Sequence, residues 1–410
     1  MNIGIFTDTY SPQINGVVTS LNTLEKVLTA RGHNIYFFVP SSPGYKEKRP
    51  NVFRLPSVSF KVSPENRMAI FYPPALLMRM RKFKFDIIHT QSEFPLGIFG
   101  KLVSEVYRKP MVHTYHTLWE EYVHYFKDSR ILTRKTARRY SRVFCNGVDA
   151  VISPTEKTKN ILESYGVKKP ISVIPTSLDF SAFSDENFPE DAVLKTREEL
   201  GIELGDPVIV TIGRIAREKS IDKIIAKMPL MLNEKPRLKF VIVGAGPALD
   251  ELKQQAADLG VSDSVIFTGA KPWETIGLYY RLGGVFVCAS TSETQGLTYT
   301  EAMASGVIPV VQRDLSVENI ISENETGFYF EGEDDLAGAV LRALNLSESE
   351  RRAVIENARE RVSGLSAEHF GAQVEKLYAE TIERYKENHR GLKRIKPPFG
   401  KRRKERETRF

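Results

Sequence analysis

The chain has 410 residues, too many for one ordinary core, so we expect two domains. Its composition, 41% hydrophobic and 27% charged, is typical of a soluble globular protein. Two cysteines argue against a disulfide scaffold or a thiolate metal site and favour a reducing cytoplasm. No apolar run approaches the roughly 18 residues of a membrane span, and the opening "NIGIF" predicts a buried strand, not a signal peptide.

The net charge of +7 is unevenly distributed along the chain. Residues 1–180 have a balance of +12, residues 181–389 a balance of −13, and the last 21 residues a balance of +8. A basic half, an acidic half and a basic tail predict two surfaces that face different partners. Nucleic acid would explain the basic charge but not the acidic half, so we expect no nucleic-acid partner.

Short apolar runs alternate with amphipathic segments in the first half. A strand at residues 3–6 precedes a helix whose pattern ends at Gly32, a typical position for a glycine after a helix. Further strands are predicted at residues 35–40, 52–55, 86–90, 110–115, 150–154 and 171–175. This alternation predicts a parallel sheet covered by helices on both faces.

The alternation pauses in an acidic stretch without periodicity, residues 179–193, and then resumes. A second series of strands is predicted at residues 208–214, 238–246, 265–270, 285–290, 307–311 and 327–330. We therefore predict an α/β protein with two doubly wound, Rossmann-like domains that face each other and bind a ligand between the carboxyl ends of their strands. The predicted boundaries are 1–180 and 197–365 for the domains, 181–196 for the linker, 366–389 for a long helix and 390–410 for a basic tail.

The segment "SETQGLTYTE", residues 292–301, joins a predicted strand to a predicted helix and holds two acids, Glu293 and Glu301. The amides of Gly296, Leu297 and Thr298 lie at the start of that helix, where unpaired N–H groups and the helix dipole favour an anion. Thr298 and Glu301 also have the spacing of a capping box, an alternative that needs no ligand. Glu293 has no such structural explanation other than a solvated loop.

The segment "GRIAREKS", residues 213–220, follows another predicted strand of the second domain. Arg214 and Lys219 would therefore stand at the same strand-end face as Glu293, where a guanidinium and an ammonium suit a diphosphate. The alternative is a solvated basic loop. One G-x-G at residues 244–246, without its third glycine, is weak evidence for a nucleotide.

In the first domain, Gly16 precedes a predicted helix after the first strand, where it lets a phosphate or sugar approach the backbone. His113 and His116 end a predicted strand, but on an extended segment residues three apart point to opposite faces. The chain also contains no Asp-x-Asp. We therefore expect no metal site.

Together these motifs resemble the retaining glycosyltransferases of family 4, which have the GT-B fold of two Rossmann-like domains. "ETQGLTYTE" matches the family's Glu-x7-Glu signature, and "GRIAREK" matches its Gly-Arg…Lys diphosphate clamp. The "NGV" turn at residues 15–17 and a C-terminal crossover helix also match, in the expected order over residues 1–388. The segments "HTQSEFPLG", "HTYHTLWEEYVHY" and the run from residue 153 to 180 are similar to those of bacterial diacylglycerol 3-alpha-glucosyltransferases. Ser177 departs from the glycine of many relatives, which puts nucleotide contacts there in doubt.

The resemblance implies a retaining hexosyltransferase that moves glucose from UDP-glucose to 1,2-diacylglycerol. From the missing Asp-x-Asp and the histidine spacing, we expect no metal or other cofactor. It also implies roles for the site residues: diphosphate binding by Arg214 and Lys219, sugar orientation by Glu293, and ribose contacts by Glu301. His116 would lie beside the sugar, and Gly16 would leave room for the diphosphate. Left open are galactose instead of glucose, another acceptor such as phosphatidylinositol or a polysaccharide intermediate, the oligomeric state, and a non-catalytic protein that binds nucleotide sugars or RNA.

Two segments of the basic half interleave charged and apolar residues, residues 73–85 and residues 130–144, and the second carries six basic residues. A single charged run is usually a solvated face, but two such runs and the tail "KRRKER" favour an anionic surface. We therefore expect a cytoplasmic protein held peripherally on the inner face of the cell membrane.

Overall fold

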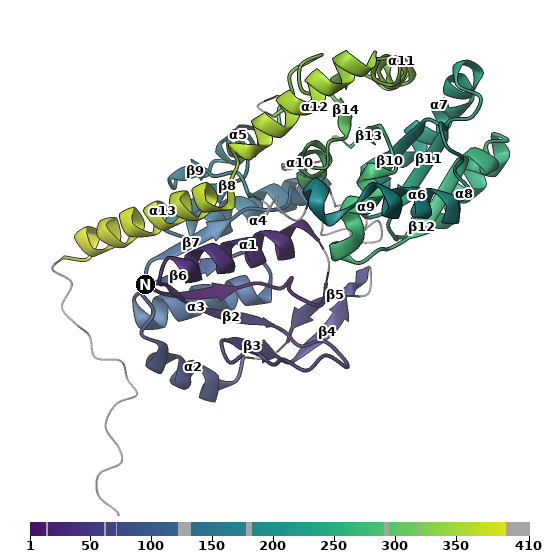
Figure 1. Ribbon diagram of the computed structural model, residues 1–410. Coiled ribbons are helices and arrows are strands. Elements are labelled where there is room, and N and C mark those ends of the chain that lie inside the picture. Colours follow the sequence, from purple (N-terminus) through teal and green to yellow (C-terminus); the bar gives the residue numbers. More distant parts are fainter. Residues whose placement is uncertain are drawn as a thin grey trace, which may run out of the picture.

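The computed structural model describes residues 1–13, 15–60, 63–70, 72–121, 133–177, 183–290, 295–318 and 320–390. Two α/β domains each form around their own sheet, and a long C-terminal helix returns from the second domain to lie against the first (Figure 1). This is the arrangement of two Rossmann-like domains that the alternating pattern predicts, and it agrees with the GT-B fold that the family resemblance implies.

Within the described residues, the first domain contains a seven-stranded parallel sheet in the order β3-β2-β1-β6-β7-β8-β9. Its strands are β1 Asn2–Phe6, β2 Asn34–Pro40, β3 Val52–Leu55, β6 Ile87–Thr90, β7 Met111–Thr114, β8 Ala150–Ser153 and β9 Ile171–Val173. Every strand predicted in the first half is present. A separate antiparallel pair, β4 Ser57–Phe60 and β5 Ser63–Ala69, was not predicted, because its polar sequence has no apolar run.

Alternating side chains of the first sheet pack on its two faces. Ile3 and Ile5 pack toward α1 and the C-terminal helix, whereas Phe6 and Ile88 pack toward α3 and α4. The helices of this domain are α1 Gly16–Ala30, α2 Pro74–Met80, α3 Pro95–Tyr107, α4 Arg134–Asn146 and α5 Glu156–Ser164. As predicted, α1 ends just before Gly32, whose φ is +82°.

The second domain contains a parallel sheet in the order β12-β11-β10-β13-β14-β15, six strands among the residues described. The strands are β10 Val208–Ile212, β11 Lys239–Val243, β12 Val265–Gly269, β13 Val285–Cys288, β14 Ile308–Gln312 and β15 Phe328–Phe330. The helices are α6 Glu190–Glu199, α7 Ile221–Glu234, α8 Leu249–Asp258, α9 Ile276–Arg281, α10 Leu297–Ala304, α11 Glu333–Leu344 and α12 Glu348–Ser363. One face packs against α7, α8 and α11, and the other against α9, α10 and α12.

The predicted linker is only partly irregular. Residues 178–182 lie outside the described residues, but the helix α6 begins at Glu190 and packs on α9. Thr196 is the buried residue of α6, and Leu194 is exposed, so the helix has no apolar stripe that a periodicity argument could detect. The last part of the predicted linker is therefore helical.

The predicted crossover helix is α13, Ala367–Asn388. Its buried side chains Phe370, Val374, Leu377 and Tyr378 complete the core of the first domain beside α1. Glu375 of α13 also pairs with Arg31, which follows α1. Among the described helices, none combines the length and the apolar character that a bilayer crossing requires.

Candidate functional site

The predicted motifs lie next to the point in each sheet where the strand order reverses, so that the chain connections on the two sides run in opposite directions. In the first domain this point lies between β1 and β6, and in the second it lies between β10 and β13. Gly16 follows β1, Arg214 follows β10, and Gly296 follows β13. In open parallel sheets such a point is where ligands bind, at the carboxyl ends of the strands.

The loop that enters α10 has a conformation that requires glycine. Gly296 has a φ of +71°, and a Cβ atom there would lie 1.8 Å from the ring of Tyr299. The helix begins at Leu297, so Thr298 is inside its first turn and cannot be the N-cap. The capping-box alternative for Thr298 and Glu301 is therefore wrong.

Glu301 instead lies in the interior, with its carboxylate oxygen Oε2 2.7 Å from the hydroxyl of Tyr280, which donates to it. Burial raises the pKa of Glu301 to about 7, while the Tyr280 hydrogen bond and the charge of Lys219 lower it. Lys219 is thus near enough to Glu301 to stabilise its charged form. The structure brings together two predicted site residues that are 82 positions apart in the sequence.

The raised pKa of Glu301 gives a prediction on stability. Because the folded protein holds this proton up to about pH 7 and an unfolded chain only to about 4.5, stability should fall as pH rises through this window. Between pH 5 and pH 8 the wild type should lose up to about 3 kcal/mol relative to Glu301→Gln, measured by urea unfolding at each pH. Glu356→Gln, at an exposed position on α12, is the control that should follow the wild type. A constant difference between wild type and Glu301→Gln at all pH values would contradict the assignment.

Arg214 and Lys219 lie on one loop between β10 and α7. The loop closes with a short 3-10 turn, Arg217–Lys219, and with Ser220 in the left-handed region at φ 49°. Ser290, at the end of the β13 segment, donates a hydrogen bond of 3.1 Å to the carbonyl of Glu218. The two motif loops of the second domain are therefore held against each other.

The G-x-G at residues 244–246 has a packing role. A Cβ atom on Gly244 would lie 1.8 Å from the carbonyl oxygen of Gly213, and one on Gly246 would lie 2.1 Å from that of Ile215. These glycines allow the loops after β10 and β11 to touch.

Residues of the two domains contact each other beside the motif loops. A Cβ atom on Gly16 would lie 3.3 Å from Cδ1 of Leu297, which places the first-domain glycine opposite the start of α10. The side-chain amide of Gln295 pairs with the backbone of Thr176, with distances of 2.8 Å to its N–H and 2.7 Å to its carbonyl. Lys157 lies 2.8 Å from both carboxylate oxygens of Asp314.

The two candidate histidines bind different partners. His113 is buried, with Nδ1 3.0 Å from the hydroxyl of Thr90 and Nε2 3.3 Å from Glu93. His116 is half-buried, and its Nε2 lies 2.7 Å from the side-chain oxygen of Gln91. Within the part of the chain that the structure describes, no group of three or more His, Cys, Asp and Glu side chains could hold a metal ion.

The two halves of the chain match two models of known families. Residues 14–182 match Glycosyltransferase Family 4, and residues 193–361 match Glycosyl transferases group 1. The alpha-monoglucosyldiacylglycerol synthase of Streptococcus pneumoniae is 36% identical over 93% of this chain and 86% of its own length. The chain belongs to glycosyltransferase family 4. It is therefore a hexosyltransferase, as the motifs imply.

Other relatives support this family 4 assignment. The synthase of the same name from Acholeplasma laidlawii is 29% identical over 94% of this chain and 98% of its own length. The structure of Anabaena HepE in complex with UDP superposes with a TM-score of 0.72 at 17% identity, over 93% of this chain and all of that one. At that identity the superposition supports the GT-B fold alone.

Of the family 4 signature, the first acid lies outside the described residues, because Glu293 falls in residues 291–294. Ser177, the departure from many family relatives, is buried, and its hydroxyl donates to the carbonyl of Leu365 just before α13. Its side chain thus joins the two chain segments that connect the domains.

Sequence reasoning missed three residues that support this family 4 site. Tyr280 holds Glu301, Gln295 holds Thr176, and Gln91 holds His116. Gln295 and Gln91 both lie inside segments that carry the family resemblance. Their position in these segments could have identified them as candidate site residues. No motif in the sequence marks Tyr280, which lies in the mainly apolar segment of α9.

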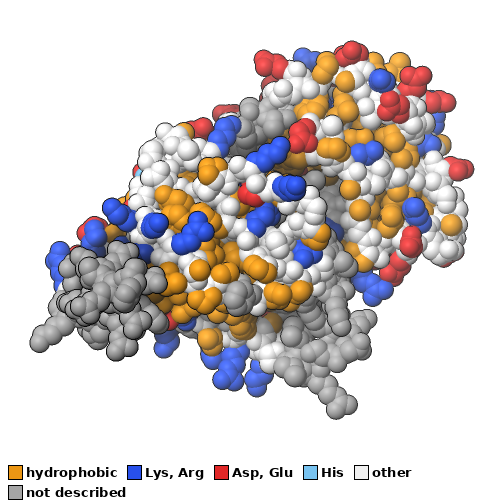
Figure 2. Space-filling view, turned by 90° about the horizontal axis from the view of Figure 1, so that it is seen from below, with side chains coloured by type: hydrophobic (Ala, Val, Ile, Leu, Met, Phe, Trp, Pro, Cys, Tyr) orange, Lys and Arg blue, Asp and Glu red, His pale blue; other side chains and the backbone are white. Residues whose placement is uncertain are grey.

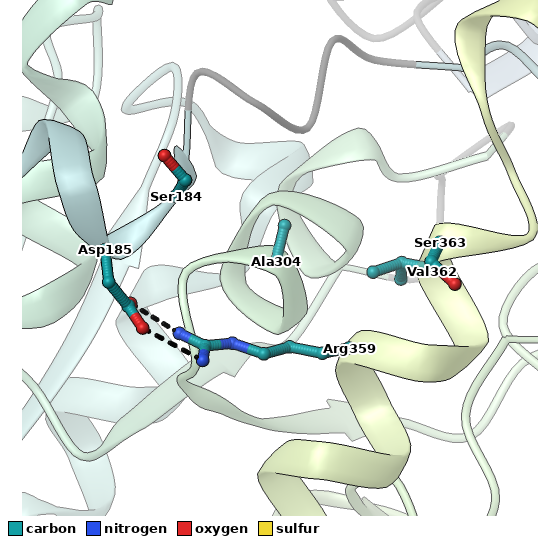
Figure 3. Close-up of a pocket in the computed structure, with 6 residues that line it drawn as sticks. All are labelled: Ser184, Asp185, Ala304, Arg359, Val362 and Ser363. Carbon is teal, nitrogen blue, oxygen red and sulfur yellow. Dashed lines mark hydrogen bonds and ion pairs between the residues drawn. The ribbon is translucent and has the colours of Figure 1, made fainter.

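A cavity of about 280 Å³ lies away from the motif loops, next to the linker. Figure 3 shows Asp185 of the linker bound by the guanidinium of Arg359 on α12, with Ala304 at the far end of α10. Asp185 also binds Arg281 of α9. This cavity lies between the linker, α10 and α12, and we assign it no substrate.

Proposed function

We propose that this enzyme transfers glucose from UDP-glucose to 1,2-diacylglycerol, with retention, at an anionic membrane surface. The observation that carries the proposal is the 36% identity, over 93% of the chain, to a relative named alpha-monoglucosyldiacylglycerol synthase. Anabaena HepE, which has the same fold, forms complexes with UDP and with UDP-glucose. The motif loops lie where the chain connections of each sheet change direction. They carry the basic side chains and backbone amides that would bind such a donor.

In the proposed donor site, Arg214 and Lys219 bind the diphosphate and stabilise the negative charge that develops when the glycosidic bond breaks. The amides at the start of α10, from Gly296 to Thr298, face the same phosphate and sugar. Gly16 leaves room for the diphosphate between the domains. These groups act by position and charge.

Glu301 would accept hydrogen bonds from the ribose hydroxyls, and Glu293 would orient the hexose. A carboxylate accepts from two hydroxyls at once, which suits a vicinal diol. Tyr280 would fix the orientation of Glu301, since it donates to one carboxylate oxygen. His116 would lie beside the hexose, and the donor phosphate would take the proton of the acceptor hydroxyl, so no protein nucleophile is required.

The proposed membrane surface is formed by α2, α3 and α4 of the first domain. On α3, Ile98, Leu102 and Val106 lie on one side of the helix and are 51%, 41% and 44% exposed. Figure 2 shows hydrophobic side chains gathered on the underside of the first domain, with Lys and Arg side chains around them. An apolar stripe between basic helices is the pattern of a surface that enters the headgroup layer.

Both predicted basic segments border this stripe. Tyr107 of α3 donates to the carbonyl of Leu77 on α2, and Phe144 of α4 packs against α3 at Gly97. The exposed basic residues of the two bordering segments are Arg79, Arg81, Lys82, Lys84, Arg134, Lys135, Arg138, Arg139 and Arg142. We propose that the two segments form one basic surface with an apolar centre, whose lipid partner would be anionic.

A different acceptor is the second candidate function. A phosphatidylinositol monomannoside mannosyltransferase of Mycolicibacterium smegmatis is 25% identical over 88% of this chain and 95% of its own length. That relative's name gives GDP-mannose as its donor. The lower identity makes this function the weaker one.

A transfer assay separates these possibilities. Purified enzyme is given labelled UDP-glucose, UDP-galactose or GDP-mannose, with diacylglycerol or phosphatidylinositol in mixed vesicles, and the products are resolved by thin-layer chromatography. We expect one labelled product, alpha-glucosyldiacylglycerol, from UDP-glucose and diacylglycerol alone. Because Arg214 and Lys219 are assigned the diphosphate charge, and no metal cofactor is proposed, EDTA should leave the rate unchanged. A product only with phosphatidylinositol, or a rate that EDTA abolishes and Mg²⁺ or Mn²⁺ restores, would refute these parts of the proposal.

A further inference from the structure

A buried row of polar side chains connects His116 to the crossover helix. His116 Nε2 lies 2.7 Å from Oε1 of Gln91, and the amide nitrogen of Gln91 lies 3.0 Å from Nε2 and 3.2 Å from Nδ1 of His89. Nδ1 of His89 in turn lies 2.6 Å from the hydroxyl of Tyr378 on α13. The row includes the end of β6, the residue after it, the segment after β7 and the helix α13.

The contacts fix the orientation of Gln91. Both ring nitrogens of His89 have partners, Tyr378 at Nδ1 and Thr114 at Nε2, the latter 2.7 Å away. The amide nitrogen of Gln91, nearly equidistant from those nitrogens, therefore lies against the face of the ring. The side-chain oxygen of Gln91 is left to face His116. Gln91, His89 and Tyr378 are all buried, so an unpaired polar atom here would be costly.

This orientation determines which nitrogen of His116 carries the proton. Burial, and to a smaller extent the charge of His113, lower the pKa of His116 from 6.5 to about 3, so the ring is neutral near pH 7. A neutral imidazole has one N–H, and an amide oxygen can only accept. Nε2 of His116 therefore donates to Gln91, and Nδ1 is the acceptor of the ring.

The row also lies next to the donor loops. A cavity of about 10 Å³ is lined by Gln91, by Ser20 in the second turn of α1, and by Thr176. Thr176 is the residue whose backbone binds Gln295, just before Gly296. Gln91 thus lies close to α1 and to the residue that binds Gln295 in the loop before α10.

We propose that Gln91 is a positioning residue that holds His116 as the neutral tautomer protonated on Nε2, so that Nδ1 accepts a hydrogen bond from a hydroxyl of the hexose donor. The hexose contact rests on the proposed function, whereas the tautomer does not. His89 and Tyr378 hold Gln91 in turn, which makes α13 a structural support of the site.

The test compares Gln91→Met, which has a similar size and no amide, with Gln91→Glu, which keeps an acceptor and adds a charge. In full-length protein labelled with ¹⁵N-histidine, the His116 signals are assigned by a His116→Asn variant. We expect wild-type His116 to stay neutral with its proton on Nε2 from pH 6 to pH 8. Gln91→Met should show a mixture of tautomers, and Gln91→Glu should keep the Nε2 proton but become charged at a higher pH than the wild type.

Kinetics provide the second measurement. In Gln91→Met, kcat with UDP-glucose should fall at least tenfold at every pH, whereas in Gln91→Glu it should approach the wild-type value at high pH and fall as the pH decreases. The matched control is Gln254→Met on the exposed surface of α8, which should change neither measurement.

Two results would overturn the proposal. One is a wild-type His116 protonated on Nδ1, or a single unchanged tautomer in Gln91→Met, which would remove Gln91 as the determinant. The other is a tautomer mixture in Gln91→Met with normal kcat, which would remove the hexose contact. If wild-type enzyme transferred no hexose at all, the proposed function would fail, and the spectra would still decide the role of Gln91.

Discussion

Changing Lys219 to Ala should lower kcat by about 10²- to 10³-fold and leave the fold intact. Removing one preorganised group that stabilises charge in a transition state costs about 3–4 kcal/mol. Lys219 is half-buried on the loop after β10, and its charge acts on the buried carboxylate of Glu301. An ammonium group held there would stabilise the departing diphosphate far more than one in open solvent.

The same substitution should change the pH dependence of the enzyme. Lys219 lowers the pKa of Glu301, so its loss should raise that pKa further and keep Glu301 protonated to a higher pH. The residual activity of Lys219→Ala should therefore reach its maximum at a higher pH than that of the wild type. The experiment is a kcat–pH profile on protein whose thermal unfolding matches the wild type.

Arg217→Ala is the matched control for Lys219→Ala. Arg217 is on the same short turn, but its guanidinium is exposed and pairs with Glu251 on the surface of α8. Its loss removes the same charge from the same loop, and surface ion pairs contribute little. Near-normal turnover in both variants would exclude Lys219 from the diphosphate site.

The strands of both domains could be predicted because each is a short apolar run buried on both faces. Phe240, Val241, Ile242 and Val243 of β11, for example, are all buried, two on each side of the sheet. The prediction missed β4, β5 and α6, whose sequences contain no apolar run or stripe. In these segments the fold depends on contacts that no local pattern encodes.

The motif residues of the candidate site were proposed from the sequence, whereas the residues that contact them were not. Gly16, Lys219 and Glu301 each follow a recognisable strand or helix signal. Tyr280 and Gln91 act through partners that only the tertiary fold brings near, as does Gln295 through Thr176, 119 positions away. The capping-box alternative for Glu301 failed for a local reason, because the left-handed Gly296 starts the helix earlier than Thr298.

The charge division of the chain was visible in its sequence, whereas the apolar stripe of α3 was not. Ile98, Leu102 and Val106 alternate with the buried Phe99 and Val103, so apolar residues lie on more than one side of this helix. Only the fold shows which side faces outward. The apolar stripe changes the prediction for membrane binding. Both the basic side chains and the stripe should now contribute to the affinity for vesicles.

Reversing Arg134, Arg139 and Arg142 of α4 to Glu should release the enzyme from anionic vesicles. Each basic side chain near an anionic leaflet contributes about 1 kcal/mol, so the loss of three should weaken binding by roughly 100-fold, and added repulsion should weaken it further. Arg138 is left in place because it pairs with Glu120. The measurement is sedimentation with vesicles that contain phosphatidylglycerol, at low and at high salt, together with transfer to diacylglycerol in the same vesicles.

The two parts of the surface should respond differently to salt. Added salt screens exposed charges over about 8 Å at physiological ionic strength, so it should weaken wild-type binding, whereas Leu102→Asn should weaken binding at every salt concentration. The matched control reverses Arg217, Lys253 and Arg352, three exposed basic residues of the second domain, and should still sediment. UDP-glucose affinity should be unchanged in the α4 variant, because the proposed diphosphate clamp lies in the other domain. Equal sedimentation of the two triple variants would mean that the α2–α4 surface serves another partner.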